Sequence, residues 1–295
     1  MTKETEDPID FDSPRSITAY LHEHNIALKK RWGQNFMVNR SARERIVAVL
    51  DPKASETVWE VGPGLGAMTG ELASRAGLLR LFEIDWGLIR HLQAIFPAGR
   101  NVQIVTGDVL DTWYEVYRTE GAPDALFGNL PYRSAAMLIG SMLEKGVVPG
   151  RMVFTVQKEV AARMAARPGT DDYSGFSVLC QAHCTVEVVG ELQPGSFFPA
   201  PEVVSSIVRL VHRVDVNPQP DPERFALLVR SAFAARRKTI GNNLGASVFG
   251  REIGKQELLR VLTDEGISPG ERAERLSPEM FAALALRLRQ AGSAQ

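Results

Sequence analysis

The sequence predicts an α/β fold, in which a parallel sheet is covered by helices on both faces, followed by a small all-α domain. Between residues 56 and 167, short apolar runs alternate regularly with stretches of helical period, and this alternation is typical of a parallel sheet. Proline and acidic residues gather at 216–223 and indicate a linker. Beyond this linker the apolar residues recur with the period of an α-helix, which predicts the second domain.

The individual elements follow from the same patterns. Strands are expected at 57–62, 78–85, 101–108, 124–131, 151–157, 185–192 and 204–211. Helices are expected at 16–28, 67–76, 87–96, 134–145, 158–167, 173–184, 223–244, 255–267 and 278–290. The prolines of SFFPAPEV at 196–203 predict a loop. The chain is therefore divided into a partly disordered N-terminal extension at 1–28, an α/β domain at 29–212 and a helical domain at 213–295.

The composition excludes several classes of protein. The chain has 295 residues, 44% of them hydrophobic and 23% charged, which is enough for a substantial core. No apolar run approaches the roughly 18 residues that a membrane span needs, and the N-terminus lacks the basic and apolar regions of a signal peptide. The two cysteines, Cys180 and Cys184, are too few for a disulfide framework. We therefore expect a cytoplasmic globular protein with no membrane partner.

Charge is distributed unevenly along a chain whose formal net charge is −1. Residues 1–12 carry five acidic residues against one lysine, a net of −4. Residues 28–45 carry six basic residues against one acid, a net of +5, and residues 224–255 carry seven against one, a net of +6. The two basic blocks are either a surface that binds a polyanion or two solvated helix faces, and charge alone does not separate these interpretations.

A glycine-rich turn follows the first strand of the α/β pattern. Gly62 and Gly64 in EVGPGLG allow backbone dihedrals and a close ligand approach that other residues prevent. The next strand ends near Glu83, where a carboxylate can accept both hydroxyls of an adenosine ribose, and the third ends at Asp108, which can accept from an adenine amino group. Because the carboxyl ends of parallel strands share one edge, these groups predict a cofactor site that suits NAD and S-adenosylmethionine (SAM) equally.

The fourth strand ends in Asn129-Leu130-Pro131-Tyr132, and this tetrapeptide favours SAM. A nicotinamide dehydrogenase needs an acid or base at this point, and the tetrapeptide offers no obvious general base. The Asn129 side-chain oxygen and the carbonyl of Leu130 or Pro131 can instead accept the two N–H groups of adenine and direct the nitrogen lone pair at a methyl donor. Pro131 stiffens the turn, and Tyr132 can stack on the purine. The sequence therefore predicts methyl transfer to an adenine amino group.

With these motifs, the chain resembles the rRNA adenine N6,N6-dimethyltransferase family, and specifically its bacterial small-subunit (16S) branch. The resemblance covers about residues 29–285. It rests on GQNFM at 33–37, EVGPGLGAMT at 60–69, EID at 83–85, GD at 107–108, NLPY at 129–132, VQKEVAARM at 156–164, FFPAPEVVSSIVRL at 197–210, FAARRKTIGNNL at 233–244 and RAERLSP at 272–278. Because the last two blocks lie in the helical domain, the resemblance extends beyond a generic methyltransferase fold.

The resemblance implies a Rossmann-like class I SAM-dependent methyltransferase domain at 29–212, with a mostly parallel sheet of seven strands, and an rRNA-binding domain at 213–295. It implies dimethylation of two adjacent adenosines near the 3′ end of 16S rRNA in the immature 30S subunit, with a role in small-subunit biogenesis. A monomer is expected. The implied SAM contacts are Asn35, Met37, Gly62, Gly64, Glu83, Asp108 and Asn129. The implied catalytic residues are Asn129, Leu130, Pro131, Tyr132 and Phe197, and the implied rRNA contacts are Arg236, Arg237 and Lys238.

The chain departs from the family pattern at four positions. Met37 replaces the usual leucine, a change that conserves volume and is expected to be tolerated. Glu202 stands where a lysine is usual, and Val204 stands where an acid or polar residue is expected. Trp86 occupies a position that is commonly charged. We expect these changes to affect local rRNA contacts and to leave the methyl chemistry unaffected.

Three alternative functions stay open on the sequence alone. A macrolide-resistance enzyme would methylate one adenosine of 23S rRNA, although the helical-domain blocks favour the small-subunit target. An NAD(P) oxidoreductase fits the glycines and does not fit NLPY. A non-catalytic 30S assembly factor would recognise the maturing particle by shape, a role that can coexist with catalysis. No metal is expected, because Cys180, His183 and Cys184 lack a fourth ligand and suit a buried helix face.

Overall fold

The computed structural model describes residues 9–29, 32–97, 101–130, 132–214 and 220–293. These residues fold as two compact units, each assembled from separate stretches of the chain. The first unit comprises Met1–Met137, Pro149–Lys158 and Val189–Arg209. The second comprises Leu138–Val148, Glu159–Val188 and Leu210–Gln295. The three segments expected from the sequence, at 1–28, 29–212 and 213–295, stay a prediction.

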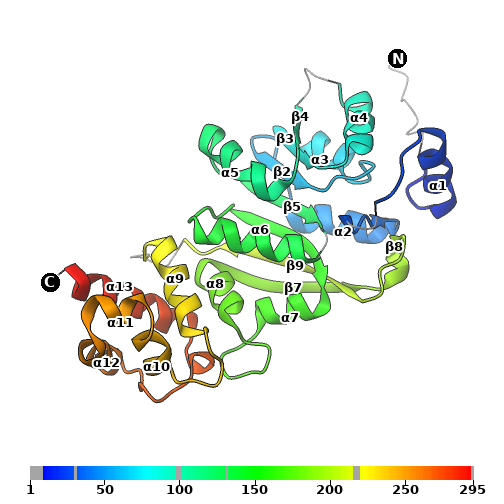
Figure 1. Ribbon diagram of the computed structural model, residues 1–295. Helices are drawn as coiled ribbons and strands as arrows, with labels where there is room; N and C mark the ends of the chain where they lie inside the picture. Colours follow the sequence, from blue (N-terminus) through cyan, green and yellow to red (C-terminus); the bar gives the residue numbers. More distant parts are fainter. Residues whose placement is uncertain (1–8, 30–31, 98–100, 131, 215–219, 294–295) are drawn as a thin grey trace. The chain divides into compact units, whose positions relative to one another are not determined.

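A seven-stranded, mostly parallel sheet organises the α/β part of the chain, as the fold class predicts. Its strand order is β4-β3-β2-β5-β6-β9-β7, and the strands from β4 to β6 pair in parallel (Figure 1). The strands are β2 (Thr57–Val61), β3 (Leu78–Glu83), β4 (Val102–Thr106), β5 (Ala125–Asn129), β6 (Arg151–Gln157), β7 (Cys184–Leu192) and β9 (Ser205–His212). The carboxyl ends of β2, β3 and β5 therefore lie at one edge of the sheet.

Helices of the first unit cover both faces of this sheet. They are α1 (Pro14–Glu23), α2 (Arg40–Leu50), α3 (Thr69–Arg75), α4 (Trp86–Ile95) and α5 (Val109–Glu120). On one face, Val58, Leu81 and Phe127 form a core with apolar residues of α2, α3 and α4. Arg80 points to the opposite face, where it pairs with Glu120 of α5. Since side chains alternate along a strand, these contacts decide which strand-end residues share a face.

The second unit is mainly helical (Figure 1). Phe225, Leu258 and Phe281 are fully buried within it, and the Tyr173 hydroxyl donates to the Leu276 carbonyl oxygen at 2.9 Å. Its helices include most of α6 (Tyr132–Glu144) and α7 (Lys158–Ala165), with α8 (Gly175–His183), α9 (Pro222–Ala232), α10 (Ile240–Gly245), α11 (Val248–Ile253), α12 (Lys255–Asp264) and α13 (Pro278–Ser293). Short 3₁₀ turns lie at η2 (Pro194–Ser196) in the first unit and η3 (Ala273–Arg275) in the second.

Helices α2, α5 and α11 were not predicted from the sequence. Each begins at a polar residue whose side chain accepts a backbone N–H of the first turn: Asn39 for α2, Asp108 for α5 and Ser247 for α11. The α5 sequence has weak helical character because it is rich in aromatic and β-branched residues. Burial of Trp113 stabilises α5 all the same.

The single helix predicted at 223–244 is wrong, because the structure breaks it into α9 and α10. The Asn243 side-chain amide donates to the carbonyl oxygens of Ala232 and Ala235 at 2.7 and 3.1 Å and so satisfies the end of α9. Thr239 then caps α10. The basic residues 236–238 consequently lie in an exposed turn between two helices.

The loop predicted at 196–203 contains a short strand. This strand, β8 (Phe197–Phe198), pairs antiparallel with β1 (Phe36–Met37), so that Met37 lies opposite Phe197. The pair joins the GQNFM segment to the proline-containing loop across about 160 residues of sequence. Neither strand shows enough alternation to be predicted on its own.

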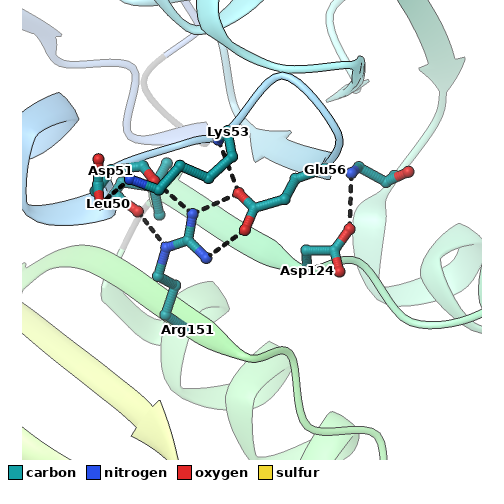
Figure 2. A network of polar contacts seen from close by, with 7 residues as sticks. Leu50, Asp51, Lys53, Glu56, Asp124 and Arg151 are labelled. Carbon is teal, nitrogen blue, oxygen red and sulfur yellow. Dashed lines mark hydrogen bonds and ion pairs between the residues drawn. The ribbon is translucent and has the colours of Figure 1, made fainter.

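A polar network fixes the edge of the sheet where β2 and β6 begin (Figure 2). The Arg151 guanidinium donates to both carboxylate oxygens of Glu56, at 2.9 and 2.5 Å, and to the carbonyl oxygens of Leu50 and Asp51. These bonds lower the pKa of the Glu56 carboxyl. The network connects the end of α2 to the amino ends of β2 and β6, which lie opposite the carboxyl ends of the strands.

Candidate active site

A cavity opens in the first unit at the carboxyl ends of β2, β3 and β5. Its empty volume is about 740 Å³ including the open mouth. The lining residues are Phe11, Trp32, Gly33, Gln34, Asn35, Phe36, Met37, Gly62, Pro63, Gly64, Leu65, Ala67, Met68, Glu83, Ile84, Leu88, Asn129 and Leu130. The predicted glycine turn, Glu83 and the first two residues of NLPY, Asn129 and Leu130, therefore meet at one cavity.

Gly62 and Gly64 shape the floor of this cavity. Both have positive φ values, +69° and +60°, which side chains other than glycine rarely adopt. A Cβ on Gly62 would lie 3.1 Å from the Leu130 side chain, and a Cβ on Gly64 would lie 3.0 Å from the Phe36 ring. A larger residue at either position would therefore strain the backbone and press against a side chain that lines the cavity.

The Glu83 carboxylate lies at the cavity wall, where its neighbours hold it in one orientation. Its Oε1 accepts the backbone N–H groups of Ile84 and Asp85, each at 2.9 Å. Burial raises the pKa of Glu83 to about 7, although backbone N–H groups, including that of Gly64, lower it in part. Glu83, which lines the cavity, is therefore close to half-ionised at neutral pH.

A second buried acid, Glu60, lies on β2 between the strand ends of β3 and β5. Only 1% of its surface is exposed, and burial raises its pKa to about 8, with the Glu83 carboxyl adding to the shift and the Thr69 hydroxyl opposing it. Among the described residues, neither Glu60 Oε2 nor Thr69 Oγ1 reaches a partner at hydrogen-bond geometry. At neutral pH Glu60 is therefore mainly protonated.

Asn129 ends β5 with its amide braced on both sides. Its Nδ2 donates to the carbonyl oxygen of Asn35 at 3.1 Å, and its Oδ1 accepts from the Thr155 hydroxyl. Thr155 lies directly opposite on β6 and is 1% exposed. An amide oxygen has two lone pairs, so Oδ1 retains one for a ligand while its orientation is fixed.

The segment that contributes Gln34 to Met37 is anchored to the end of β3. Gln34 Nε2 donates to Asp85 Oδ2 at 3.1 Å, while Asp85 Oδ1 accepts the N–H of Gly87 at the start of α4. Lys29 Nζ lies 3.6 Å from the same carboxylate and 4.1 Å from the centre of the Trp32 ring. A buried aspartate thus connects the first basic block to the cavity wall.

Half of the fourteen predicted site residues line the cavity, namely Asn35, Met37, Gly62, Gly64, Glu83, Asn129 and Leu130. Asp108 caps α5 with its Oδ1, and Phe197 is 5% exposed within the core beside Met37, so neither is among the lining residues. Pro131 and the side chain of Tyr132 lie outside the described residues. Arg236, Arg237 and Lys238 form the exposed turn of the second unit. The roles of all these residues stay predictions.

Three functional contributions were missed by reasoning from the sequence. Thr155 was overlooked because a threonine inside an apolar strand carries no signal of its own until β6 is paired with β5. Phe11 lies in the segment that was expected to be partly disordered, and it lines the cavity. His91 is buried in α4 and donates from Nε2 to the Leu65 carbonyl oxygen at 3.0 Å, which connects that helix to the glycine turn.

The positions that depart from the family pattern differ in their exposure. Met37 is buried and lines the cavity, whereas Glu202 is exposed and Val204 is half-buried. Trp86 is 67% exposed at the first position of α4. The three positions at or near the surface can therefore change without altering the cavity.

The residues once considered as metal ligands belong to the core of the second unit. Burial raises the pKa of Cys184 to about 12 and lowers that of His183 to about 4. Within the described parts of the chain, no cluster of three His, Cys, Asp or Glu side chains is placed to hold a metal ion. No helix in those parts is both long and apolar enough to cross a membrane.

Comparison with known proteins accounts for this arrangement. A family model described as "Ribosomal RNA adenine dimethylase" matches residues 25–290. The chain belongs to the ribosomal RNA adenine dimethylase family. A protein of Treponema pallidum (strain Nichols) named "Ribosomal RNA small subunit methyltransferase A" is 39% identical over 289 residues, covering 95% of this chain and 98% of its own length. A protein of the same name from Bacillus cytotoxicus is 37% identical, covering 93% of this chain and 96% of its own.

Solved structures show the same fold. A dimethyladenosine transferase from Plasmodium falciparum aligns with a TM-score of 0.73 at 24% identity, covering 86% of this chain and 97% of its own. The 23S rRNA methyltransferase ErmE aligns with a TM-score of 0.63 at 24% identity, covering 87% of this chain and 100% of its own. Enzymes with different names thus share this architecture, so the fold by itself does not identify the RNA substrate.

As a ribosomal RNA adenine dimethylase, the chain is a SAM-dependent methyltransferase, and the cavity fits that cofactor. The glycine turn lacks the Cβ atoms that would crowd the cavity lining. Glu83, at the end of β3, presents a carboxylate of the kind that accepts ribose hydroxyls. Apolar side chains from Ile84 and Leu88 provide a surface for a planar base. A nicotinamide-dependent oxidoreductase is excluded by the family assignment.

Proposed function

We propose that this chain dimethylates N6 of two adjacent adenosines near the 3′ end of 16S rRNA in the immature 30S subunit, in the cytoplasm. The observation that carries the chemistry is the braced amide of Asn129 at the mouth of a cavity that also contains the glycine turn and Glu83. Two relatives that are 39% and 37% identical along nearly the whole chain are named as small-subunit methyltransferases, and this supports the small-subunit target.

The cofactor is held by groups that the cavity already orients. Glu83 accepts the ribose hydroxyls, the Asn35–Met37 segment forms one wall, and the turn at Gly62 and Gly64 admits the methionine part. When bound, SAM supplies a methyl group on a sulfonium, which is a good leaving group. The enzyme therefore contributes mainly orientation and exclusion of water.

The target amine is oriented by acceptors at the end of β5. The free lone pair of Asn129 Oδ1 accepts one N6–H, and the backbone carbonyl of Leu130 is the candidate for the other. With both N–H groups held, the nitrogen lone pair would be free to face a methyl donor bound in the cavity. Tyr132 and Phe197 are proposed to stack on the two faces of the extruded adenine, and Asp108 is proposed to accept from the cofactor's own adenine.

Recognition of the ribosomal particle is proposed to involve the second unit. Arg236, Arg237 and Lys238 are exposed in the turn between α9 and α10. The Arg236 guanidinium donates to the Asp171 carbonyl oxygen at 3.2 Å, which orients the turn without neutralising its charge. Such contacts bind phosphates and position the protein, whereas contacts at the cavity select the base.

The test is methylation of 30S particles that lack dimethyladenosine. Purified full-length protein and SAM carrying a labelled methyl group are incubated with these particles, and with 50S subunits in a parallel reaction. Mass mapping of the rRNA fragments is expected to find four methyl groups on two adjacent adenosines of 16S rRNA, two on each, and no methyl groups on 23S rRNA. Methyl groups on 23S rRNA alone would assign the chain to the macrolide-resistance type of target.

A charge variant separates docking from chemistry. Replacing Arg236, Arg237 and Lys238 by glutamine is expected to weaken binding to 30S particles and to reduce the salt dependence of that binding, because about three phosphate contacts are removed. SAM affinity is expected to stay unchanged. Unchanged 30S affinity across the salt series would show that rRNA docks elsewhere.

A further inference from the structure

We propose that residues 9–29, ahead of the GQNFM segment, form part of the cofactor site, and that Tyr20 and His91 act as positioning residues for the glycine turn. This inference rests on the proposed cofactor site and goes beyond its motifs. The family model begins at residue 25, so the segment at 9–24 lies outside the matched region. Three separate contacts within the first unit join it to the cavity.

The first contact is apolar packing. Phe11 lines the cavity directly, together with Trp32, Phe36 and Leu65. Ile9, Ile17, Tyr20, Leu21 and Ile26 are buried in one cluster with Phe36, Leu65 and Leu88. All three of these partners also line the cavity. The N-terminal segment therefore supports the cavity wall from behind and supplies part of it.

The second contact is a chain of hydrogen bonds that reaches the glycine turn. His91 Nε2 lies 3.0 Å from the Leu65 carbonyl oxygen, and His91 Nδ1 lies 2.9 Å from the Tyr20 hydroxyl. A carbonyl oxygen only accepts, so Nε2 carries the proton of the neutral ring. Nδ1 then accepts from the Tyr20 hydroxyl. Tyr20 thereby fixes the tautomer and the ring orientation with which His91 holds the turn between Gly64 and Gly66.

The third contact holds the opposite wall. Arg43 Nη2 pairs with Asp12 Oδ1 at 2.5 Å, and Arg43 Nη1 donates to the Met37 carbonyl oxygen at 2.9 Å. The Arg43 side chain is only 11% exposed. One guanidinium thus connects the start of the N-terminal segment to the cavity-lining strand β1. The glycine turn and strand β1, which both line the cavity, are therefore each connected to residues 9–29.

This coupling predicts a specific effect on the cofactor. Without the Tyr20 hydroxyl, His91 can rotate or change tautomer, and the glycine turn loses a fixed contact that cofactor binding must then restore. Loss of Phe11 removes a wall against which the cofactor packs. Both changes are expected to weaken SAM binding and to leave binding of 30S particles unaffected.

The experiment measures SAM binding to full-length protein by calorimetry, with no RNA present. Tyr20→Phe keeps the ring and its packing, and loses the hydroxyl alone; we expect the Kd for SAM to rise about fivefold, the equivalent of one hydrogen bond. Phe11→Ala is expected to raise it about tenfold, from the apolar contact that is lost. His22→Ala, an exposed change on the same helix, is the matched control and is expected to leave Kd unchanged.

A double-mutant cycle tests whether Tyr20 acts through His91. In a His91→Phe background, Tyr20→Phe is expected to have no further effect on the Kd for SAM, because the partner of its hydroxyl is gone. In steady-state assays on 30S particles, the KM for SAM is expected to rise while kcat at saturating SAM and the KM for particles stay constant. A merely structural role would change the melting temperature and move all three parameters.

The outcomes separate this inference from the proposed function. A Kd for SAM that is unchanged in both Phe11→Ala and Tyr20→Phe overturns the inference, and an equal effect of Tyr20→Phe in both backgrounds overturns the role of His91. If the wild-type protein binds SAM and leaves 30S particles unmethylated, the proposed substrate is wrong and the inference stands. If the wild-type protein does not bind SAM, both fail.

Discussion

The ends of β3 and β5 carry the two most informative polar residues of the cavity, and they are held in different ways. Glu83 is oriented by the backbone of the two residues that follow it. Asn129 is oriented by groups 94 positions before it and 26 positions after it in the chain. Glu83 is therefore held by its neighbours in the sequence. Asn129 is oriented only once the Asn35–Met37 segment, β5 and β6 have come together.

The largest expected effect is at the β5 end. Asn129→Ala removes the oriented acceptor, and we expect kcat on 30S particles to fall about a thousandfold, as for loss of a preorganised polar group in other active sites. SAM affinity is expected to change by less than about tenfold, because Glu83 and the glycine turn remain. Single-turnover methylation and calorimetry measure the two quantities. A comparable loss in both would mean that Asn129 serves the cofactor as much as the target.

The next effect is at the β3 end and depends on pH. With a pKa of about 7, Glu83 is mostly protonated at pH 6 and mostly ionised at pH 8. If the carboxylate accepts both ribose hydroxyls, as proposed, SAM should bind about tenfold more tightly at pH 8 than at pH 6. Glu83→Gln serves as the control, because any pH dependence of SAM binding that remains in this variant comes from other groups, including those of SAM. It is expected to bind SAM more weakly at pH 8 and to lose most of this dependence.

A smaller effect is expected from the brace behind Asn129. Thr155→Val keeps the shape of the side chain and removes the hydroxyl, and we expect kcat to fall about fivefold, since the amide loses one of its two fixed contacts. Thr155→Ser restores a donor and is expected to recover most of the activity. Failure of serine to recover activity would indicate that the methyl group, and not the hydroxyl, supports the site.

The smallest effect on methylation is expected at Glu60, between the two strand ends. Its pKa rises from 4.5 to about 8 on folding, so the unfolded chain releases the proton first as pH increases. The folded state therefore loses stability relative to the unfolded state as pH rises from 4.5 to 8, by about 5 kcal/mol at most. Glu60→Gln removes this loss. Urea melts of both proteins at pH 5 and pH 8 should show the variant gaining stability at the higher pH only.

The glycine turn and Glu83 could be predicted from the sequence, whereas the residues that orient Asn129 could not. The glycine turn and Glu83 follow directly from a strand and its next residues, and the predicted fold class is confirmed. Asn129 was identified by its motif, yet Thr155 and the Asn35 carbonyl that orient it are defined only by strand pairing. Phe11 was hidden in a segment whose acidic composition indicated disorder.

Helix ends account for the other differences between prediction and structure. Asp108 was interpreted as a ligand because it follows a strand; its Oδ1 also caps α5, and its role as a ligand stays a prediction. A continuous helical pattern at 223–244 concealed the break, because Asn243 caps the carbonyl groups of α9 from within the next helix. A capping contact between residues eight to eleven positions apart leaves no periodic signal.

The two acceptors proposed at the β5 end also give the reaction a direction. Adenine N6 begins with two N–H donors, one for Asn129 Oδ1 and one for the Leu130 carbonyl. Each methyl transfer replaces one donor by a methyl group, so the monomethylated base keeps one bond and the dimethylated base keeps none. Affinity for the base therefore decreases stepwise as the reaction proceeds, and the finished product has lost the polar contacts that held it.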